Sequence, residues 1–150
     1  MLTVHLNLRK NDNPKHNYYI GLAYLYGIDV EKNNKKGLLL ILSAADNNCI
    51  EAMKKLSLMY LNGDGVDKDY LQAIVWQEKI VSLLKNKYIE LSNEENSYNY
   101  LYELGVLISY YDDVNEYNKA INICNEKLQE INKLLSLTNY KWLEEQLVYT

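Results

Sequence analysis

The sequence is poor in arginine, proline and cysteine, and it contains no phenylalanine. One Arg, one Pro and two Cys occur among its 150 residues. The formal net charge is −4, and no cluster of Lys or Arg is present. Proteins that bind nucleic acid need such clusters to displace counterions from phosphates. Nucleic acid is therefore not expected as a partner.

Long apolar runs are also missing. The longest, residues 38–42, is far shorter than the roughly 20 residues that cross a bilayer. The segment before Arg9 is too short and too polar for a signal peptide. We expect no membrane association and a cytoplasmic location.

The two cysteines, Cys49 and Cys124, cannot form a disulfide framework. Neither has a Cys or His neighbour at the spacing of a metal site. Both are expected to be small buried side chains. No metal and no cofactor are expected.

Asparagine and tyrosine are abundant, with 19 Asn and 15 Tyr. Together with the preference for Lys over Arg, this composition indicates an AT-rich gene. Exposed tyrosines are also rigid contact residues suited to interfaces.

The chain repeats itself at an offset of 36 residues. Residues 24–32 (YLYGIDVEK) align without a gap with residues 60–68 (YLNGDGVDK). A period of this length predicts two antiparallel helices per unit, each pair covering the apolar face of the next. The expected fold class is therefore all-α, a solenoid of stacked antiparallel helix hairpins.

Small residues recur at fixed places in each unit. Gly21 and Ser57 lie beside the apolar stripe of the first helix, where a small side chain lets a neighbouring helix approach closely. Gly27 and Gly63 follow the last periodic residue and would end that helix in the left-handed conformation. Asp69 is a candidate N-cap for the following helix. The residues with expected structural roles are Gly21, Tyr24, Gly27, Ser57, Tyr60, Gly63, Gly65, Val66, Ala73 and Trp76.

The pattern L/I-G/S-x-x-Y-x-x-G-x-G/D-V, followed by a small residue and an aromatic one, resembles the Sel1-like repeat, a relative of the tetratricopeptide repeat. The second copy has every position, including Gly65 and Trp76. In the first copy Asp29 replaces the second loop glycine and Leu40 replaces the aromatic residue. The resemblance covers about residues 16–84 and implies an α-solenoid.

We expect one domain. It would comprise an N-terminal segment (1–12), repeat one (13–48), repeat two with a linker (49–91), a divergent tetratricopeptide-like hairpin (92–136) and a C-terminal capping helix (137–150). The S-x-x-E spacing from Ser92 predicts a capping box at the start of the third hairpin. One long helix with a continuous apolar seam is predicted from the spacing of Tyr117, Ile121, Cys124, Leu128, Ile131 and Leu135. A short closing helix is predicted around Tyr140, Trp142, Leu143 and Leu147.

No catalytic set of residues is recognisable. His5 and His16 have no Ser, Cys or acid at a suggestive spacing. The pairs Glu94-Glu95 and Asp112-Asp113 stand at expected helix boundaries, where carboxylates stabilise the N-terminal dipole. The chain is expected not to be an enzyme. The competing hypothesis is an enzyme or ligand-binding protein with a groove of acids and tyrosines formed by Asp112, Asp113, Tyr110 and Tyr111.

Several apolar residues lie opposite the buried stripe of each first helix. In a stacked solenoid they would line the concave side, and a contiguous apolar strip is typical of protein-binding surfaces. The candidate partner-binding residues are Tyr18, Leu22, Leu25, Tyr26, Lys54, Leu58, Leu61, Tyr102 and Val106. The alternative is that the long C-terminal helix folds back and covers this strip, which would then be core.

The sequence therefore predicts a non-enzymatic protein interaction module that binds a partner protein through its concave face. The specific hypothesis is an immunity protein that occludes a bacterial toxin, from the small size, acidity and AT-rich gene. An adaptor or host-directed effector built from the same repeats is an alternative, and a structural homo-oligomer is a third. The oligomeric state does not follow from the sequence.

Overall fold

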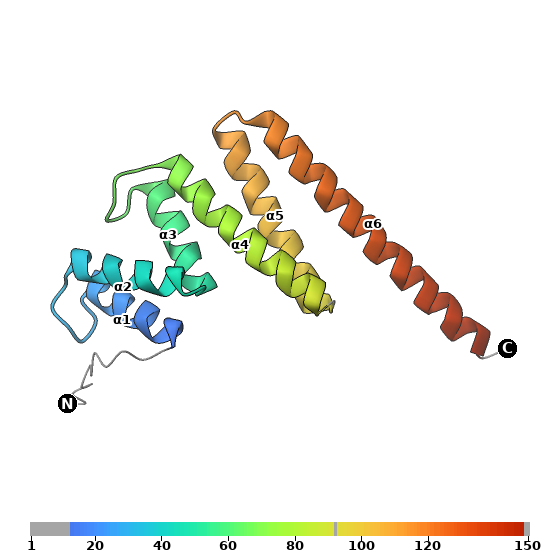
Figure 1. Cartoon of the computed structure of the whole chain (residues 1–150), viewed down its shortest axis with the longest axis horizontal. Coiled ribbons are helices and arrows are strands. Elements are labelled where there is room, and N and C mark those ends of the chain that lie inside the picture. The colour runs from blue at the N-terminus through green and yellow to red at the C-terminus, as the bar shows by residue number, and fades with distance from the viewer. Residues whose placement is uncertain (1–12, 92, 149–150) are drawn as a thin grey trace.

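The computed structural model describes residues 13–91 and 93–148, with side chains as far as residue 137. In these residues the chain forms six helices and no strand (Figure 1). They are α1 (Pro14–Tyr26), α2 (Asn34–Asp46), α3 (Ile50–Asn62), α4 (Tyr70–Glu90), α5 (Glu94–Asp113) and α6 (Tyr117–Val148). Consecutive helices pack together, giving three hairpins stacked in chain order. The predicted all-α solenoid is confirmed.

The first two hairpins turn in the same way. Gly27 (φ 70°) and Gly63 (φ 76°) end α1 and α3 in the left-handed conformation. Asp29 has φ 58° at the position where the second copy has Gly65 with φ 77°. Asp tolerates the left-handed region better than most non-glycine residues. The first loop therefore keeps the geometry of the second although its glycine is replaced.

The second helices begin with matching caps. The side chain of Asn33 accepts a hydrogen bond from the Lys36 amide at 2.9 Å. Asp69, 36 residues later, accepts from the amides of Leu71 and Gln72 at 2.9 and 3.0 Å. These bonds satisfy amides that have no partner inside the helix. The prediction of Asp69 as an N-cap is confirmed.

Small residues let the two helices of each hairpin cross closely. A Cβ atom on Gly21 would lie 2.9 Å from the carbonyl oxygen of Gly37, and one on Gly37 would lie 2.8 Å from that of Gly21. At the equivalent positions of the second hairpin, the Ser57 hydroxyl donates to the Ala73 carbonyl oxygen at 3.0 Å. The backbones therefore approach too closely for larger side chains, as predicted for Gly21 and Ser57.

One continuous core joins the hairpins. Ile41 and Leu56 are fully buried at its start, Trp76 and Ile80 lie in its middle, and Tyr100 lies at its far end. Tyr24, Tyr60 and Val66 are half-buried. None of the described helices is both long enough and apolar enough to cross a bilayer.

The third hairpin differs from prediction at its boundaries. The N-cap of α5 is Asn93, whose side chain accepts from the Asn96 amide at 2.8 Å; Ser92 lies outside the described residues. Glu94 and Glu95 occupy the first turn of α5, as predicted. Asp112-Asp113 instead end that helix, so the prediction that they stabilise an N-terminal dipole is wrong.

Helix α6 is continuous, and the predicted separate closing helix does not form. The reason is local, because residues 117–148 contain neither Gly nor Pro to interrupt the helix. Residues 1–12, for which no structure was predicted, lie outside the described residues.

The face of α6 that packs on the body is not the predicted apolar seam. Ala120 is buried, whereas Ile121 and Leu128 are 56% and 60% exposed. Cys124 is exposed, so its predicted burial is wrong, while the burial of Cys49 is confirmed. The packed face combines Ala120 and Ile123, which lie against the core, with Glu126 and Glu130, which accept hydrogen bonds from Tyr100 and Tyr88. Apolar periodicity does not register such contacts.

Candidate partner-binding face

Helices α1, α3 and α5, the first helix of each hairpin, are joined by polar side chains. Lys15 of α1 forms an ion pair with Glu51 of α3 at 2.7 Å. Lys54 of α3 forms an ion pair with Glu103 of α5. We call the surface formed by the exposed side chains of α1, α3 and α5, among them Tyr26, Leu58 and Tyr102, the first-helix face.

The predicted partner-binding residues divide into exposed and packed groups. Tyr26, Leu58 and Tyr102 are 55%, 48% and 55% exposed, and Lys54 is also exposed. Each of the three helices therefore presents at least one large exposed side chain. The members that are half-buried and packed against the core are Tyr18, Leu22, Leu61 and Val106.

Leu25 does not lie on this surface. It is 8% exposed, and its Cγ atom lies 2.8 Å from where a Cβ of Gly37 would be. The missing side chain at Gly37 leaves a space that Leu25 fills. The prediction of Leu25 as a surface contact is therefore wrong.

Helix α6 does not cover the first-helix face. Among the described residues its backbone contacts are with α5, and its side chains reach α4 through the Lys85–Glu126 ion pair. Figure 1 shows α6 beyond α5, at the end of the stack away from α1. The alternative in which this helix fills the predicted strip is not the arrangement found.

Two exposed tyrosines on the first helices were not among the predicted contact residues. Tyr98 is 67% exposed and stacks on Tyr102 with ring centroids 6.2 Å apart. Tyr19 is 61% exposed and its ring centroid lies 5.2 Å from that of Tyr18. The four-residue spacing of Tyr98 and Tyr102 on a predicted helix was the available signal.

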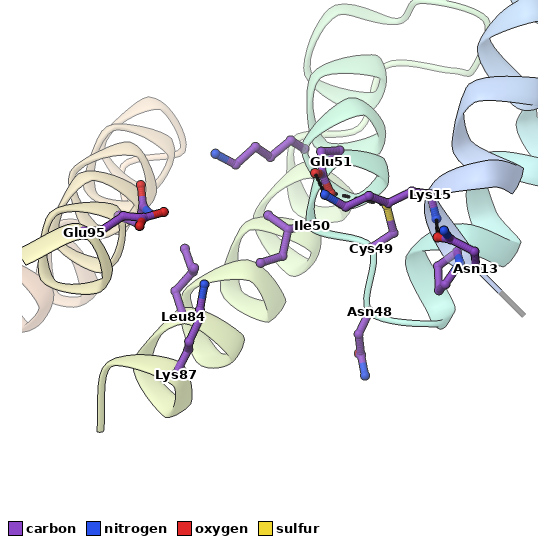
Figure 2. A pocket seen from close by; sticks show the side chains of 12 residues that line it. Asn13, Lys15, Asn48, Cys49, Ile50, Glu51, Leu84, Lys87 and Glu95 are labelled. Carbon is purple, nitrogen blue, oxygen red and sulfur yellow. Dashed lines mark hydrogen bonds and ion pairs between the residues drawn. The ribbon is translucent and has the colours of Figure 1, made fainter. Parts of the chain in front are cut away.

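A cleft of about 610 Å³ adjoins this face at the N-terminal ends of α1, α3 and α5 (Figure 2). Figure 2 shows Glu95 of α5 on one side of it and Lys15 of α1 on the other. Leu84 and Lys87 of α4 also line it. Of the predicted contact residues it includes Lys54 alone.

Lys15 and Glu51, which both line the cleft, form a hydrogen-bonded ion pair. The hydrogen bond from Lys15 lowers the pKa of Glu51, and the same bond raises the pKa of Lys15. Burial raises the pKa of the Cys49 thiol, whose Sγ lies 3.4 Å from a carboxylate oxygen of Glu51. A raised pKa keeps this thiol protonated and a poor nucleophile.

The proposed acid and tyrosine groove is not assembled. Tyr110 and Tyr111 are buried, whereas Asp112 and Asp113 are exposed at the end of α5. Burial, followed by the hydrogen bond from Tyr111 to Glu78, raises the pKa of the Tyr111 phenol. The described part of the chain has no group of three or more His, Cys, Asp or Glu side chains that could hold a metal ion.

Of the two histidines, the structure describes His16. His16 is half-buried in α1, and the structure gives it no acid or nucleophile partner within the described residues. His5 lies outside the described residues.

Fold and surface together define a repeat protein of stacked helix hairpins. The family model named Sel1 repeat matches two consecutive segments of the chain, residues 17–49 and 50–80. This confirms the resemblance seen in the sequence. Sel1 repeat proteins generally mediate protein–protein interactions.

Comparison with solved structures gives a crystal structure of a Sel1 repeat protein from Oxalobacter formigenes. The similarity covers 77% of this chain and 49% of that one, with 22% sequence identity and a TM-score of 0.49. The chain thus spans about half the length of that protein. Comparison with curated protein sequences finds no significant match.

Proposed function

We propose that the chain is a non-enzymatic module that binds a partner protein through its first-helix face. The observation that carries this proposal is the exposure of Tyr26, Leu58 and Tyr102, one on each of three successive first helices. Large aromatic and aliphatic side chains surrounded by charged groups are typical of interface centres. The Sel1 repeats in residues 17–80 support the same class of function.

The charged groups beside these residues are already positioned before binding. Lys54 is held by Glu103, which is buried and also accepts a hydrogen bond from Gln77 at 2.7 Å. A side chain that is ordered in the free protein loses less conformational entropy when a partner binds. The face therefore combines apolar anchors with pre-ordered charges.

Within this class, the partner that we propose is a bacterial toxin, with the chain acting as its immunity protein. The formal net charge of −4 and the pI of about 5.2 support a basic partner, because complementary charge speeds encounter and favours the correct partner. This specific role rests on acidity and on the binding face, and it is separable from the general proposal.

The general proposal is tested by co-purification from the source cell with the Leu58→Asp variant. A buried carboxylate at the interface centre should abolish capture of the partner. Leu39→Asp is the matched control, since Leu39 is 59% exposed on α2, outside the first-helix face. Both variants should keep the thermal midpoint of the wild type. Equal capture by both variants would place the binding site elsewhere.

The specific proposal is tested with the product of the gene adjacent to the one encoding this chain. That product should arrest growth of a bacterial host, and co-expression of the wild-type chain should restore growth. Leu58→Asp should fail to restore growth, whereas Leu39→Asp should succeed. A harmless neighbour would refute the immunity role and leave the co-purification result unaffected.

A further inference from the structure

Helix α5 exposes a row of one acid and two tyrosines. Glu94, Tyr98 and Tyr102 stand four residues apart, so their side chains are neighbours along one side of the helix. All three are exposed, and the exposed fractions of Tyr98 and Tyr102 are 67% and 55%. We call these three residues the α5 stripe. The α5 stripe belongs to the first-helix face, which includes Tyr102.

The two tyrosine rings of the α5 stripe stack on each other. Their centroids lie 6.2 Å apart, and their planes are inclined by 26°. Within the described residues, neither phenol hydroxyl has a hydrogen-bond partner. The face of an aromatic ring carries partial negative charge and attracts cations. The pair therefore presents to solvent a surface that suits a cation.

Elsewhere the chain places its own lysines over aromatic rings. The amino group of Lys36 lies 4.1 Å from the ring centroid of Tyr24, and that of Lys79 lies 4.1 Å from the ring centroid of Trp76. No lysine of the described residues lies over either ring of the α5 stripe. These two rings are therefore free to receive a cation from another molecule.

The charge of α5 is negative throughout. The helix contains five acidic residues and no Lys or Arg. Lys54 neutralises the buried Glu103, whereas Glu94 has no ion pair with any residue that the structure describes. Lys127 of α6 lies against Gly105, one turn beyond the α5 stripe, and is the nearest cation on that side. An exposed carboxylate without an ion pair thus stands beside the two stacked rings.

We propose that the α5 stripe binds an arginine side chain of the partner protein. The guanidinium group stacks on the rings of Tyr98 and Tyr102, and its N–H groups donate to the carboxylate of Glu94. This inference names the chemistry that the first-helix face recognises, so its biological role rests on the proposed function.

Arginine fits this arrangement better than lysine. A planar guanidinium can lie flat on an aromatic ring while its edge donates to a carboxylate, and it is more weakly hydrated than an ammonium group. The formal net charge of −4 also favours approach by a basic partner. An exposed arginine on the partner therefore satisfies the rings and the acid together.

Tyr19 of α1 provides a comparison within the same chain. It is 61% exposed, and its ring centroid lies 5.2 Å from that of a second tyrosine, Tyr18. The residue four positions before it is Lys15, which is ion-paired with Glu51. Tyr19 thus has an ammonium group where the α5 stripe has a free carboxylate, and it should not bind arginine.

The first test is a titration of the full chain with N-acetyl-arginine amide, followed by NMR of isotope-labelled tyrosine rings. The resonances of Tyr98 and Tyr102 should shift and saturate, while those of Tyr19 stay in place. The citrulline counterpart, which keeps the shape of arginine but has no charge, should cause no saturable shift. Absence of a saturable shift at both stripe rings overturns the proposal, and so does an equal response to citrulline or at Tyr19.

The second test repeats the titration with variants. Glu94→Gln should weaken arginine binding about threefold, and Tyr98→Ala should weaken it about fivefold. Tyr19→Ala, the matched control, should bind arginine as the wild type does. All three side chains are exposed, so the variants should keep the wild-type circular dichroism. Unchanged affinity in both stripe variants would contradict the proposed contact.

Co-purification from the source cell separates this inference from the proposed function. Tyr98→Ala should capture less partner than the wild type, and Tyr19→Ala should capture more than Tyr98→Ala. If Leu58→Asp abolishes capture and Tyr98→Ala captures as much as the wild type, the face binds the partner and the arginine contact is wrong. If Leu58→Asp captures normally while arginine still binds the α5 stripe, the proposed function fails and the stripe remains an arginine site.

Discussion

The close crossing of α1 and α2 can be tested by one chemical change made at two positions. Gly37 lies in α2, where an added Cβ would be 2.8 Å from the Gly21 carbonyl oxygen and 2.8 Å from Cγ of Leu25. Gly105 lies in α5, where an added Cβ would meet the terminal amino group of Lys127 at 2.7 Å. A flexible lysine end can move aside, whereas a helix backbone cannot.

The two Gly→Ala substitutions should therefore act in opposite directions. In a helix, alanine is favoured over glycine by about 1 kcal/mol, so Gly105→Ala should raise the free energy of unfolding by about that amount. At Gly37 the same gain is opposed by overpacking of about 1–3 kcal/mol. We expect Gly37→Ala to be about 1 kcal/mol less stable than the wild type, and about 2 kcal/mol less stable than Gly105→Ala.

The assay is thermal unfolding followed by circular dichroism at 222 nm. For a chain of this size, about 2 kcal/mol corresponds to a difference of about 6 °C between the two midpoints. Because both variants remove one glycine from the unfolded chain, unfolded-state effects largely cancel. A Gly37→Ala variant as stable as Gly105→Ala would refute the close contact of the two backbones.

Three further outcomes follow from the described contacts. Asp29→Gly should raise the free energy of unfolding by about 0.5–1 kcal/mol, because glycine relieves the left-handed strain at φ 58°; urea unfolding measures this. Lys54→Ala should lower the free energy of unfolding by about 2 kcal/mol, because it leaves the buried carboxylate of Glu103 without its ion pair. A second substitution, Glu103→Gln, should recover part of this loss in a double-mutant cycle. Hydrogen bonds from Lys85, the larger cause, and from Tyr100 of α5 lower the pKa of Glu126. The ionised Glu126 therefore stabilises the fold above the ordinary carboxyl pKa of about 4.3, and this stabilisation is lost as the pH falls through the lowered pKa. Glu126→Gln should therefore flatten the acid side of a plot of urea midpoint against pH, and an unchanged slope would contradict this contribution.

The first two hairpins were predictable because local chemistry determines their geometry. Glycine at positions 27 and 63 marks where left-handed caps end the first helices, and the 36-residue offset pairs them. Asp69 is recognisable as an N-cap because its side chain accepts a hydrogen bond from the amide of Leu71, two residues later. Such features depend on residues close in sequence, so they can be identified without knowing the tertiary packing.

The packed face of α6 and the burial of Leu25 were less predictable because tertiary contacts decide both. The apolar seam of α6 suggested one packed face, but α6 packs through another, which carries Ala120, Ile123 and the hydrogen-bonded Glu126 and Glu130. Leu25 has the spacing of a surface residue, yet the space beside Gly37 buries it. Both outcomes depend on residues of another helix, which helical periodicity does not include.

The central claim is that partners bind the first-helix face, and amide hydrogen exchange of the free and bound chain tests it most directly. Binding should slow exchange in α1, α3 and α5, around Tyr26, Leu58 and Tyr102, while α2 exchanges at its free rate. Protection confined to α2, with the first helices unchanged, would contradict the claim.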